Sequence, residues 1–357
     1  MSDKVIISVD GMGGSNAPRA VVEGMAIAAA NCADMHFLIC GHQNVLPAVL
    51  SEFPELQGRY KFMHADGVVL DNESPVRALR YGQDSSMRAA IDAVKNEQAI
   101  ACVSSGNTGA LMVMSKMVLG MLEDISRPAI VGVMPNRAGG TVLLDMGANT
   151  ECDEYNLFQF ALMGASYAKI CLKRANPRIG VLNVGVEEIK GTTLQKRTYE
   201  LLQNSNLNFK GYVEGFDLIE GTVDVIVTDG FTGNIVLKTA EGTAKLCVEY
   251  MKVALKSTIL SRIGGFLVRK AIKKQFDKID TREVNGAMFA GINGIVVKSH
   301  GSAESKAFAS ALKLAYELAK RRVNQDIAAE LASLRVDSPA SLHPTLMGKI
   351  KKTLGMN

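Results

Sequence analysis

The sequence predicts an α/β fold built on a mostly parallel, doubly wound sheet. Short apolar runs alternate with segments in which apolar residues recur about every 3.6 positions. Five of these runs end in a glycine-rich turn that opens a polar or helical segment. With 357 residues, 47% of them apolar, the chain is also large enough to bury an extensive core. Alternating strands and helices are typical of parallel sheets covered by helices on both faces.

The first two thirds of the chain supply most of the expected elements. Strand-like runs occupy residues 4–9, 35–40, 99–104, 178–183 and 223–228. Helical patterns lie at residues 19–30, 85–95, 107–122 and 154–173. Residues 131–135 and 141–144 flank a short turn that contains two glycines, which predicts a β-hairpin. One antiparallel pair is therefore expected inside the sheet.

Two longer helical patterns dominate the second half. One covers residues 232–274, with a break expected only at Gly264-Gly265, and the other covers residues 303–334. We predict a single α/β domain over residues 1–335, from which a helical hairpin at about residues 245–280 protrudes. Residues 336–357 are rich in Pro, Ser and Lys and predict a flexible tail.

Composition excludes several classes of protein. The net charge of +4, the absence of Trp and the low aromatic content argue against a nucleic-acid partner. No export signal is expected, and the longest apolar segment, residues 110–122, is interrupted by Lys116 and too short to span a bilayer. The cysteines have no metal-ligand spacing, so we expect no metal and predict reduced core residues of a cytosolic protein: Cys32, Cys40, Cys102, Cys152, Cys171 and Cys247.

The five glycine-rich turns are the main functional signal. They end the segments at residues 5–14, 99–110, 141–149, 179–191 and 223–234, and each carries Asp or Asn. Glycine lets a backbone approach an anion closely, and the free N–H groups of a helix start attract negative charge. Because loops at the carboxyl ends of parallel strands converge on one crevice, the turns together predict a phosphate site.

The first turn, residues 10–18, does not fit a dinucleotide site. It ends a strand and starts a helix, with Ser15 or Asn16 as the expected cap. A dinucleotide fingerprint would have glycine where Asn16 stands and an acidic residue at the end of the next strand, where the chain has Cys40-Gly41-His42. An NAD-dependent dehydrogenase is therefore disfavoured, and we expect no cofactor.

Two turns repeat one G-x-T-G design after an apolar strand, at residues 106–109 and 230–233. Each offers hydroxyl and amide donors above a helix start. A simple helix cap needs only one polar residue. The repeated design therefore favours binding of a small phosphate or an acyl phosphate over capping alone.

Cationic residues follow two further strands. Lys190 lies at the head of a helix, where it adds a full charge to the partial charges of the backbone. It can instead be paired with Glu187. Lys298 and His300 follow another strand-like run, and His300 is the best placed of the five histidines, although a lone histidine is often only a structural hydrogen-bonding residue.

The segment 251–274 interleaves apolar and basic residues without one acidic residue. Basic amphipathic helices of this kind can lie in the interface of an anionic membrane. The segment can also form an interface between two copies of the chain or receive an acidic carrier protein. The residues predicted to contact the membrane or a partner are Leu260, Ile263, Phe266, Leu267, Arg262, Arg269 and Lys270.

Taken in order, the motifs resemble a known family. They are D-x-M-G-G, S-S-G-N-T-G-A, L-L-D-x-G-A-N, N-x-G-x-E-x-x-K-G-T, V-T-D-G-F-T-G-N and G-x-N-G-x-x-x-K-S-H-G-S. Over about residues 4–333 the chain resembles the bacterial phosphate acyltransferases of phospholipid synthesis. The resemblance implies an enzyme that makes acyl phosphate from acyl-acyl carrier protein and orthophosphate, for use by a glycerol-3-phosphate acyltransferase.

The resemblance also implies an architecture and a location. It implies a three-layer fold akin to phosphate acetyltransferases and the isocitrate dehydrogenase group. It further implies a cytosolic homodimer whose basic hairpin docks on the inner face of the cell membrane.

For this reaction no serine or cysteine needs activation, because orthophosphate is itself an anionic nucleophile. We predict Lys190 as the cation at the phosphate or oxyanion and Asn234 as a neutral donor. Free carboxylates would repel phosphate, so Asp10, Asp145 and Asp229 are expected to orient loops by accepting N–H groups. The remaining predicted pocket residues are Gly13, Gly14, Ser105, Asn107, Thr108, Asn149, Thr232, Lys298 and His300.

Two other functions remain open at this point. One is a short-chain phosphate acyltransferase that uses acyl-coenzyme A. The other is a non-catalytic, membrane-associated protein that binds phosphate or acyl phosphate.

Overall fold

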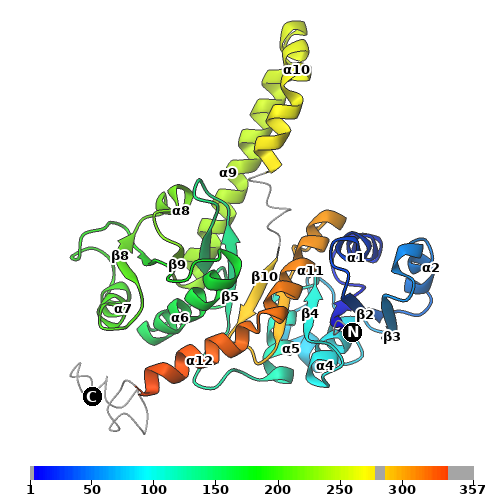
Figure 1. The fold of residues 1–357 in the computed structure, drawn as a ribbon, viewed down its shortest axis with the longest axis horizontal. Coiled ribbons are helices and arrows are strands. Elements are labelled where there is room, and N and C mark those ends of the chain that lie inside the picture. Colours follow the sequence, from blue (N-terminus) through cyan, green and yellow to red (C-terminus); the bar gives the residue numbers. More distant parts are fainter. Residues whose placement is uncertain (1–3, 278–285, 337–357) are drawn as a thin grey trace.

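The computed structural model describes residues 4–277 and 286–336 (Figure 1). The last residues of the predicted hairpin and nearly all of the predicted tail lie outside these ranges.

Within the described residues, eleven strands form one sheet in the order β3-β2-β1-β4-β11-β10-β5-β6-β9-β7-β8. Seven neighbouring pairs are parallel and three are antiparallel, so the predicted mostly parallel sheet is confirmed. The strands are β1 (Val5–Asp10), β2 (Met35–Gly41), β3 (Tyr60–His64), β4 (Ala101–Ser104), β5 (Ala129–Met134), β6 (Thr141–Leu144), β7 (Ile179–Leu182), β8 (Phe209–Val213), β9 (Val225–Val227), β10 (Ala287–Ala290) and β11 (Ile295–Lys298).

The three antiparallel pairs lie together at the centre of the sheet. They are β11/β10, β10/β5 and β5/β6, and the last is the hairpin that the sequence predicts. Three successive reversals make β1, β4 and β11 run opposite to β6, β9 and β7. The expectation that all the glycine-rich turns follow strands of one direction is therefore wrong. We call the loops after β1, β4 and β11 the first loop group, and those after β6, β7 and β9 the second.

Helices cover both faces of the sheet and give the three layers that were predicted. Two apolar clusters lie on the two faces. One contains side chains of α1, α2, α6, α7, α11 and α12, and the other contains side chains of α3, α4, α5, α8 and the start of α9. Successive side chains of a strand point to opposite faces of the sheet, so one strand contributes to both clusters. On β4, Val103 packs in the first cluster and Cys102 in the second.

The helices begin and end as follows: α1 (Arg19–Asn31), α2 (Leu46–Leu50), α3 (Pro75–Tyr81), α4 (Ser86–Lys95), α5 (Thr108–Leu119), α6 (Glu154–Cys171), α7 (Thr193–Gln203), α8 (Asp217–Glu220), α9 (Gly230–Lys256), α10 (Ile259–Asp277), α11 (Ser305–Lys320) and α12 (Val323–Val336). A short 3-10 helix occupies Pro54–Leu56.

Both long helical patterns are divided, which corrects two predictions. The first breaks between α9 and α10 rather than at the two glycines, because the Thr258 hydroxyl accepts the Ser261 N–H at 3.0 Å and starts a new helix. Gly265 instead lies inside α10 beside Leu255 of α9. The second breaks between α11 and α12, where Arg322 has a φ of 53°.

Helices α9 and α10 project together from the body of the molecule (Figure 1). Apolar side chains on α10 point into solvent, and Leu260 and Phe266 are 80% and 76% exposed. Among residues 4–277 and 286–336, no helical segment combines the length and hydropathy that a bilayer span requires.

The six cysteines are all free thiols. Cys40 and Cys102 are buried on the sheet, as predicted, but Cys247 is exposed on α9. The expectation that all six are core residues is therefore wrong, because the apolar run around Cys247 belongs to the projecting helix.

Candidate functional site

Asp10 forms the floor of the first turn. Ser86 and Ser104 donate their hydroxyls to its two carboxylate oxygens, each at 2.6 Å, and the Met12 N–H also donates to it at 3.3 Å. Burial raises the pKa of Asp10, against these hydrogen bonds. A Cβ atom on Gly13 would lie 2.3 Å from the carboxylate, so only glycine fits above it. Asp10 thus faces inward and shapes the backbone of the turn.

The turn after β1 lies against the turn after β11. The Ser15 N–H donates to the Gly301 carbonyl at 2.9 Å, and the Asn16 amide donates to the Ser302 carbonyl at 3.1 Å. Gly14 has a φ of +90°, and a Cβ there would lie 2.8 Å from the same Gly301 oxygen. The predicted cap is wrong, because α1 begins at Arg19 after Pro18 and no side chain caps it.

Lys298 ends β11 beside Ser104 of β4. Its ammonium donates to the carbonyls of Ser105, at 3.2 Å, and of Ser299. Burial lowers the pKa of Lys298 to about 8, and the charge of Lys238 on α9 acts in the same direction, while Asp71 and Asp10 oppose it. This amine is therefore a cation near neutral pH that loses its charge at mildly alkaline pH.

His300 lies in the loop after β11, where its side chain is partly exposed to solvent. Its Nδ1 is 3.0 Å from the Ser302 hydroxyl and accepts the Ser302 N–H at 3.2 Å. Partial burial lowers the pKa of His300; Lys238, Lys298 and Lys245 lower it further, and Glu241 opposes them.

The loop after β4 uses Asn107 to join two segments. The Asn107 side-chain oxygen accepts the Ala110 N–H at 3.0 Å and caps α5. Its amide donates to the carbonyls of Asp71 and Glu73, at 2.9 and 2.8 Å. The Asn107 side chain therefore holds the loop at residues 70–73, and Thr108, which begins α5, is the exposed polar residue of this turn.

In the second loop group, Asp145 is fully buried after β6. It accepts the backbone N–H groups of Ile130, Gly147, Ala148 and Asn149, at 2.7 to 3.1 Å, and the Asn149 side-chain amide at 2.8 Å. Burial raises the pKa of Asp145, against these bonds. The same Asn149 amide donates to the Pro128 carbonyl at 2.7 Å. Asn149 thus fastens the loop rather than pointing away from it.

Asp229 caps the start of α9. It accepts the N–H and the hydroxyl of Thr232, at 2.8 and 2.9 Å. A Cβ on Gly233 would lie 1.9 Å from the Asp145 carbonyl oxygen, so the first turn of α9 is pressed against the loop after β6. Asn234, the next residue, is exposed and lies over that loop, where a Cβ on Gly147 would be 3.3 Å from the Asn234 Cβ.

Lys190 is exposed in the loop after β7. Strand β7 is the neighbour of β9 in the sheet. Its backbone N–H donates to the Glu187 carbonyl at 2.9 Å, but no ion pair joins the two side chains. The Lys190 side chain passes over Gly185, where a Cβ would be 3.3 Å from its Cγ. Lys190 thus belongs to the second loop group, whereas Lys298 belongs to the first.

Helix α9 begins in the second loop group. Asn234 lies over the loop after β6, and farther along the helix the charge of Lys238 lowers the pKa of Lys298 and of His300. The sequence analysis missed Lys238, and it missed the two serines that hold Asp10. The spacing of four residues between Asn234 and Lys238 was the available signal for the lysine.

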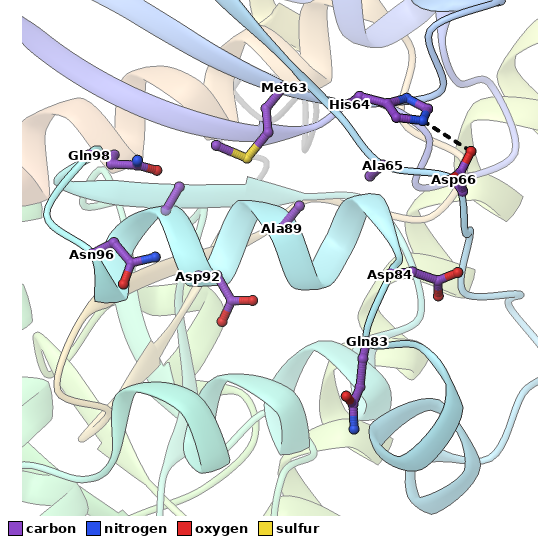
Figure 2. Close-up of a pocket in the computed structure, with 11 residues that line it drawn as sticks. Met63, His64, Ala65, Asp66, Gln83, Asp84, Ala89, Asp92, Asn96 and Gln98 are labelled. Carbon is purple, nitrogen blue, oxygen red and sulfur yellow. Dashed lines mark ion pairs between the residues drawn. The ribbon is translucent and has the colours of Figure 1, made fainter.

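A separate hollow of about 300 Å³ lies between the end of β3 and α4 (Figure 2). Figure 2 shows His64 paired with Asp66, at 3.0 Å, on its rim. Asp84 and Asp92 also line it, and none of the predicted site residues does. With carboxylates and no lysine or arginine in its lining, this hollow does not suit an anion and is distinct from both loop groups.

The lowered pKa of Lys298 gives a testable pH dependence. Between pH 7 and 9 the dissociation constant for orthophosphate should rise about tenfold, because most of the Lys298 amines lose their proton above pH 8. Lys298→Arg should remove this rise, since arginine stays charged. Calorimetric titration of orthophosphate into both proteins measures the rise. Because orthophosphate itself changes protonation in the same pH range, the arginine variant serves as the reference for that change. Identical profiles would contradict a role of the Lys298 charge.

The chain is similar to proteins of known class. A family described as fatty acid synthesis protein matches residues 5–326. The phosphate acyltransferase of Paramagnetospirillum magneticum is 45% identical over 97% of this chain and 98% of its own, and that of Rhodospirillum rubrum is 43% identical over 94% and 97%.

Solved structures agree with the fold. A phosphotransacetylase from Streptococcus pyogenes has a TM-score of 0.59 at 17% identity, covering 89% of this chain and 94% of its own. A branched-chain phosphotransacylase from Enterococcus faecalis has a TM-score of 0.53 at 14% identity, covering 88% and 99%. The predicted likeness to phosphate acetyltransferase folds is confirmed.

Proposed function

The chain belongs to the fatty acid synthesis protein family, and on this premise we propose that it transfers a long-chain acyl group reversibly from acyl-acyl carrier protein to orthophosphate. It is an acyltransferase of lipid synthesis, as its relatives named phosphate acyltransferase indicate. The acyl phosphate formed in this way is a substrate for a glycerol-3-phosphate acyltransferase on the way to phosphatidic acid.

One observation carries the proposal. Asp10, Asp145 and Asp229 all turn inward and accept the N–H and hydroxyl groups of their own loops. The exposed groups of these loops and of the first turns of α9 include an amide and two ammonium groups, on Asn234, Lys190 and Lys238. A surface with buried carboxylates and exposed donors suits an anionic substrate.

The reaction then needs positioning more than activation. An orthophosphate oxygen attacks the thioester carbon, the C–S bond breaks, and the thiolate leaves and takes up a proton. Lys190 balances the negative charge of the phosphate, and the Asn234 amide donates to the oxyanion that forms on the thioester carbon. One well-placed donor of this kind contributes about 3–4 kcal/mol to the transition state.

We place the enzyme as a homodimer at the inner face of the membrane, with α10 as the contact. The exposed apolar side chains of Leu260, Ile263, Phe266 and Leu267 support this, together with the exposed cations Arg262, Arg269 and Lys270. Apolar residues buried in the interface and cations near anionic headgroups act together in such helices.

Ile263→Asp or Phe266→Asp should release the protein from anionic vesicles. Each change removes an apolar side chain from the interface and adds a charge that the headgroups repel, so binding should weaken at least about tenfold. Co-sedimentation with vesicles that contain phosphatidylglycerol measures it. Val76→Asp is the matched control, because the exposed fraction of Val76 lies between those of Ile263 and Phe266 but the residue is on α3. Unchanged sedimentation of the α10 variants would favour an interface between two copies.

A comparison of acyl donors tests the function itself. The purified protein is incubated with orthophosphate and either palmitoyl-acyl carrier protein or acetyl-coenzyme A, and the released thiol is followed. The proposal predicts release from the first donor. Turnover of acetyl-coenzyme A alone would favour the short-chain enzyme, and no turnover with either donor would favour a non-catalytic binding protein.

A further inference from the structure

The first turn of α9 and the loop after β6 meet backbone against backbone. The Gly230 N–H donates to the Asn149 carbonyl at 2.7 Å. A Cβ on Gly230 would lie 2.7 Å from the backbone nitrogen and oxygen of Asn149, and one on Gly233 would lie 1.9 Å from the Asp145 carbonyl oxygen. No side chain fits at such distances, so glycine at both positions lets the two backbones touch. The start of α9 is therefore fixed to this loop at two points.

Gly147 is a third glycine of this contact, and it lies beneath a side chain. Its N–H donates to the Asp145 carboxylate at 3.1 Å, which holds it from below. A Cβ on Gly147 would lie 3.3 Å from the Cβ of Asn234 and 3.5 Å from both its Cγ and its Oδ1. The Asn234 side chain thus lies along the bare backbone of Gly147 from its Cβ to its amide.

The direction of the Asn234 side chain follows from its place on the helix. The Cα–Cβ bonds of a helix tilt toward its N-terminus, so Asn234, in the second turn of α9, reaches back over the loop after β6. The Thr232 hydroxyl in the first turn is already bonded to Asp229 at 2.9 Å. Thr232 therefore serves the turn itself, whereas the Asn234 amide is exposed above Gly147.

We propose that Gly147 is a positioning residue for acyl transfer, because its missing side chain sets the direction of the Asn234 amide. The inference rests on the proposed function, in which this amide donates to the oxyanion on the thioester carbon. Such a donor has to be held within about 0.5 Å of its productive position. Since carbon atoms prefer separations of about 3.5–4.0 Å, a Cβ at residue 147 would push Asn234 away by much of that tolerance.

Steady-state kinetics of Gly147→Ala test the inference on the full chain. With palmitoyl-acyl carrier protein and orthophosphate, we expect kcat to fall about tenfold, because a displaced donor no longer meets the oxyanion. Both KM values should stay within about twofold of the wild type, since the oxyanion exists only in the transition state and not in the bound substrates.

Gly139→Ala is the matched control for backbone strain. Gly139 has a φ of +106° and Gly147 a φ of +128°, so alanine strains the backbone at either position. A Cβ on Gly139, in the turn between β5 and β6, would meet nothing within 4 Å. Urea unfolding should show a loss of stability in both variants, whereas Gly139→Ala should keep a near-normal kcat.

A double-mutant cycle separates positioning from a general loss of structure. In the Asn234→Ala background the amide is absent, so adding Gly147→Ala should change kcat by less than about twofold. A merely structural role of Gly147 would lower kcat by the same factor in both backgrounds.

Asn234→Gln tests the same contact without altering the glycine, and it decides the matter if Gly147→Ala fails to fold. Glutamine keeps the amide but carries it one carbon–carbon bond, about 1.5 Å, farther from the backbone. If the contact with Gly147 sets the donor position, this variant should lose as much turnover as Asn234→Ala does.

Three results would overturn the positioning role of Gly147. They are a kcat of Gly147→Ala equal to that of Gly139→Ala, a full effect of Gly147→Ala in the Asn234→Ala background, and near-normal turnover of Asn234→Gln. Near-normal turnover of Asn234→Ala would instead overturn the proposed role of Asn234 itself, and this inference with it. The cycle therefore distinguishes a failure of the inference from a failure of the proposed function.

Discussion

Lys190→Ala is expected to reduce acyl phosphate formation at least about a hundredfold while the protein stays folded. Lys190 is exposed in its loop and makes no ion pair within the described residues, so its removal leaves no buried group unpaired. What is lost is the positive charge that balances phosphate and oxyanion in the transition state. Asn234→Ala should have a similar effect, because the exposed amide is not used to hold the loop beneath it.

Initial rates with palmitoyl-acyl carrier protein and orthophosphate measure this effect, and circular dichroism shows whether the fold persists. Lys196→Ala is the matched control, because Lys196 is exposed on the helix that follows the same loop. Near-normal turnover in either site variant would show that its role is assigned wrongly. If a site variant loses no more activity than Lys196→Ala does, its role is likewise assigned wrongly.

Asp145→Ala should lower the free energy of unfolding by about 3–5 kcal/mol. The change removes the acceptor of four backbone N–H groups in a buried loop, and the Asn149 amide keeps only its bond to the Pro128 carbonyl. The loop also supports the first turn of α9 through Gly233, so activity should fall together with stability. Urea unfolding followed by circular dichroism measures the difference.

Asp153→Ala provides the comparison, since Asp153 also accepts a backbone N–H, from Asn156 at 2.8 Å, as the cap of α6. Loss of a cap of this kind costs about 1 kcal/mol. If the two substitutions destabilise the protein equally, Asp145 does not have the structural role that its hydrogen bonds indicate.

Much of the fold follows from local pattern. The 3.6-residue repeats placed α1, α4, α5 and α6 within a few residues of their observed bounds, and the turn at residues 136–140 predicted the hairpin of β5 and β6. These elements depend on side chains close in the sequence. The breaks near Thr258 and Arg322 were missed because a single cap or one left-handed residue ends a helix without altering the apolar pattern.

Strand direction was not predictable in the same way. β10 lies between β11 and β5 and is antiparallel to both. Its pairing with β5 joins segments that are more than 150 residues apart in the sequence. No local pattern specifies such a pairing. For that reason the glycine-rich turns were expected at one end of the sheet, whereas they form two groups.

Part of the site could be predicted from the sequence on electrostatic grounds. A carboxylate beside phosphate is unfavourable, so the expectation that Asp10, Asp145 and Asp229 orient their loops required no knowledge of the fold. Asn107, Asn149 and Thr232 have the same residue types as ligand-binding groups, yet their side chains form the loops themselves. Only the packing of a turn distinguishes a donor for the loop from a donor for the ligand.

The claim at the centre of this account is that orthophosphate attacks the thioester directly. The most direct measurement follows thiol release from palmitoyl-acyl carrier protein in rapid mixing, with and without orthophosphate. We predict no release without phosphate, and one acyl phosphate for each thiol when phosphate is present. A burst of thiol equal to the enzyme concentration in the absence of phosphate would reveal an acyl-enzyme and contradict direct attack.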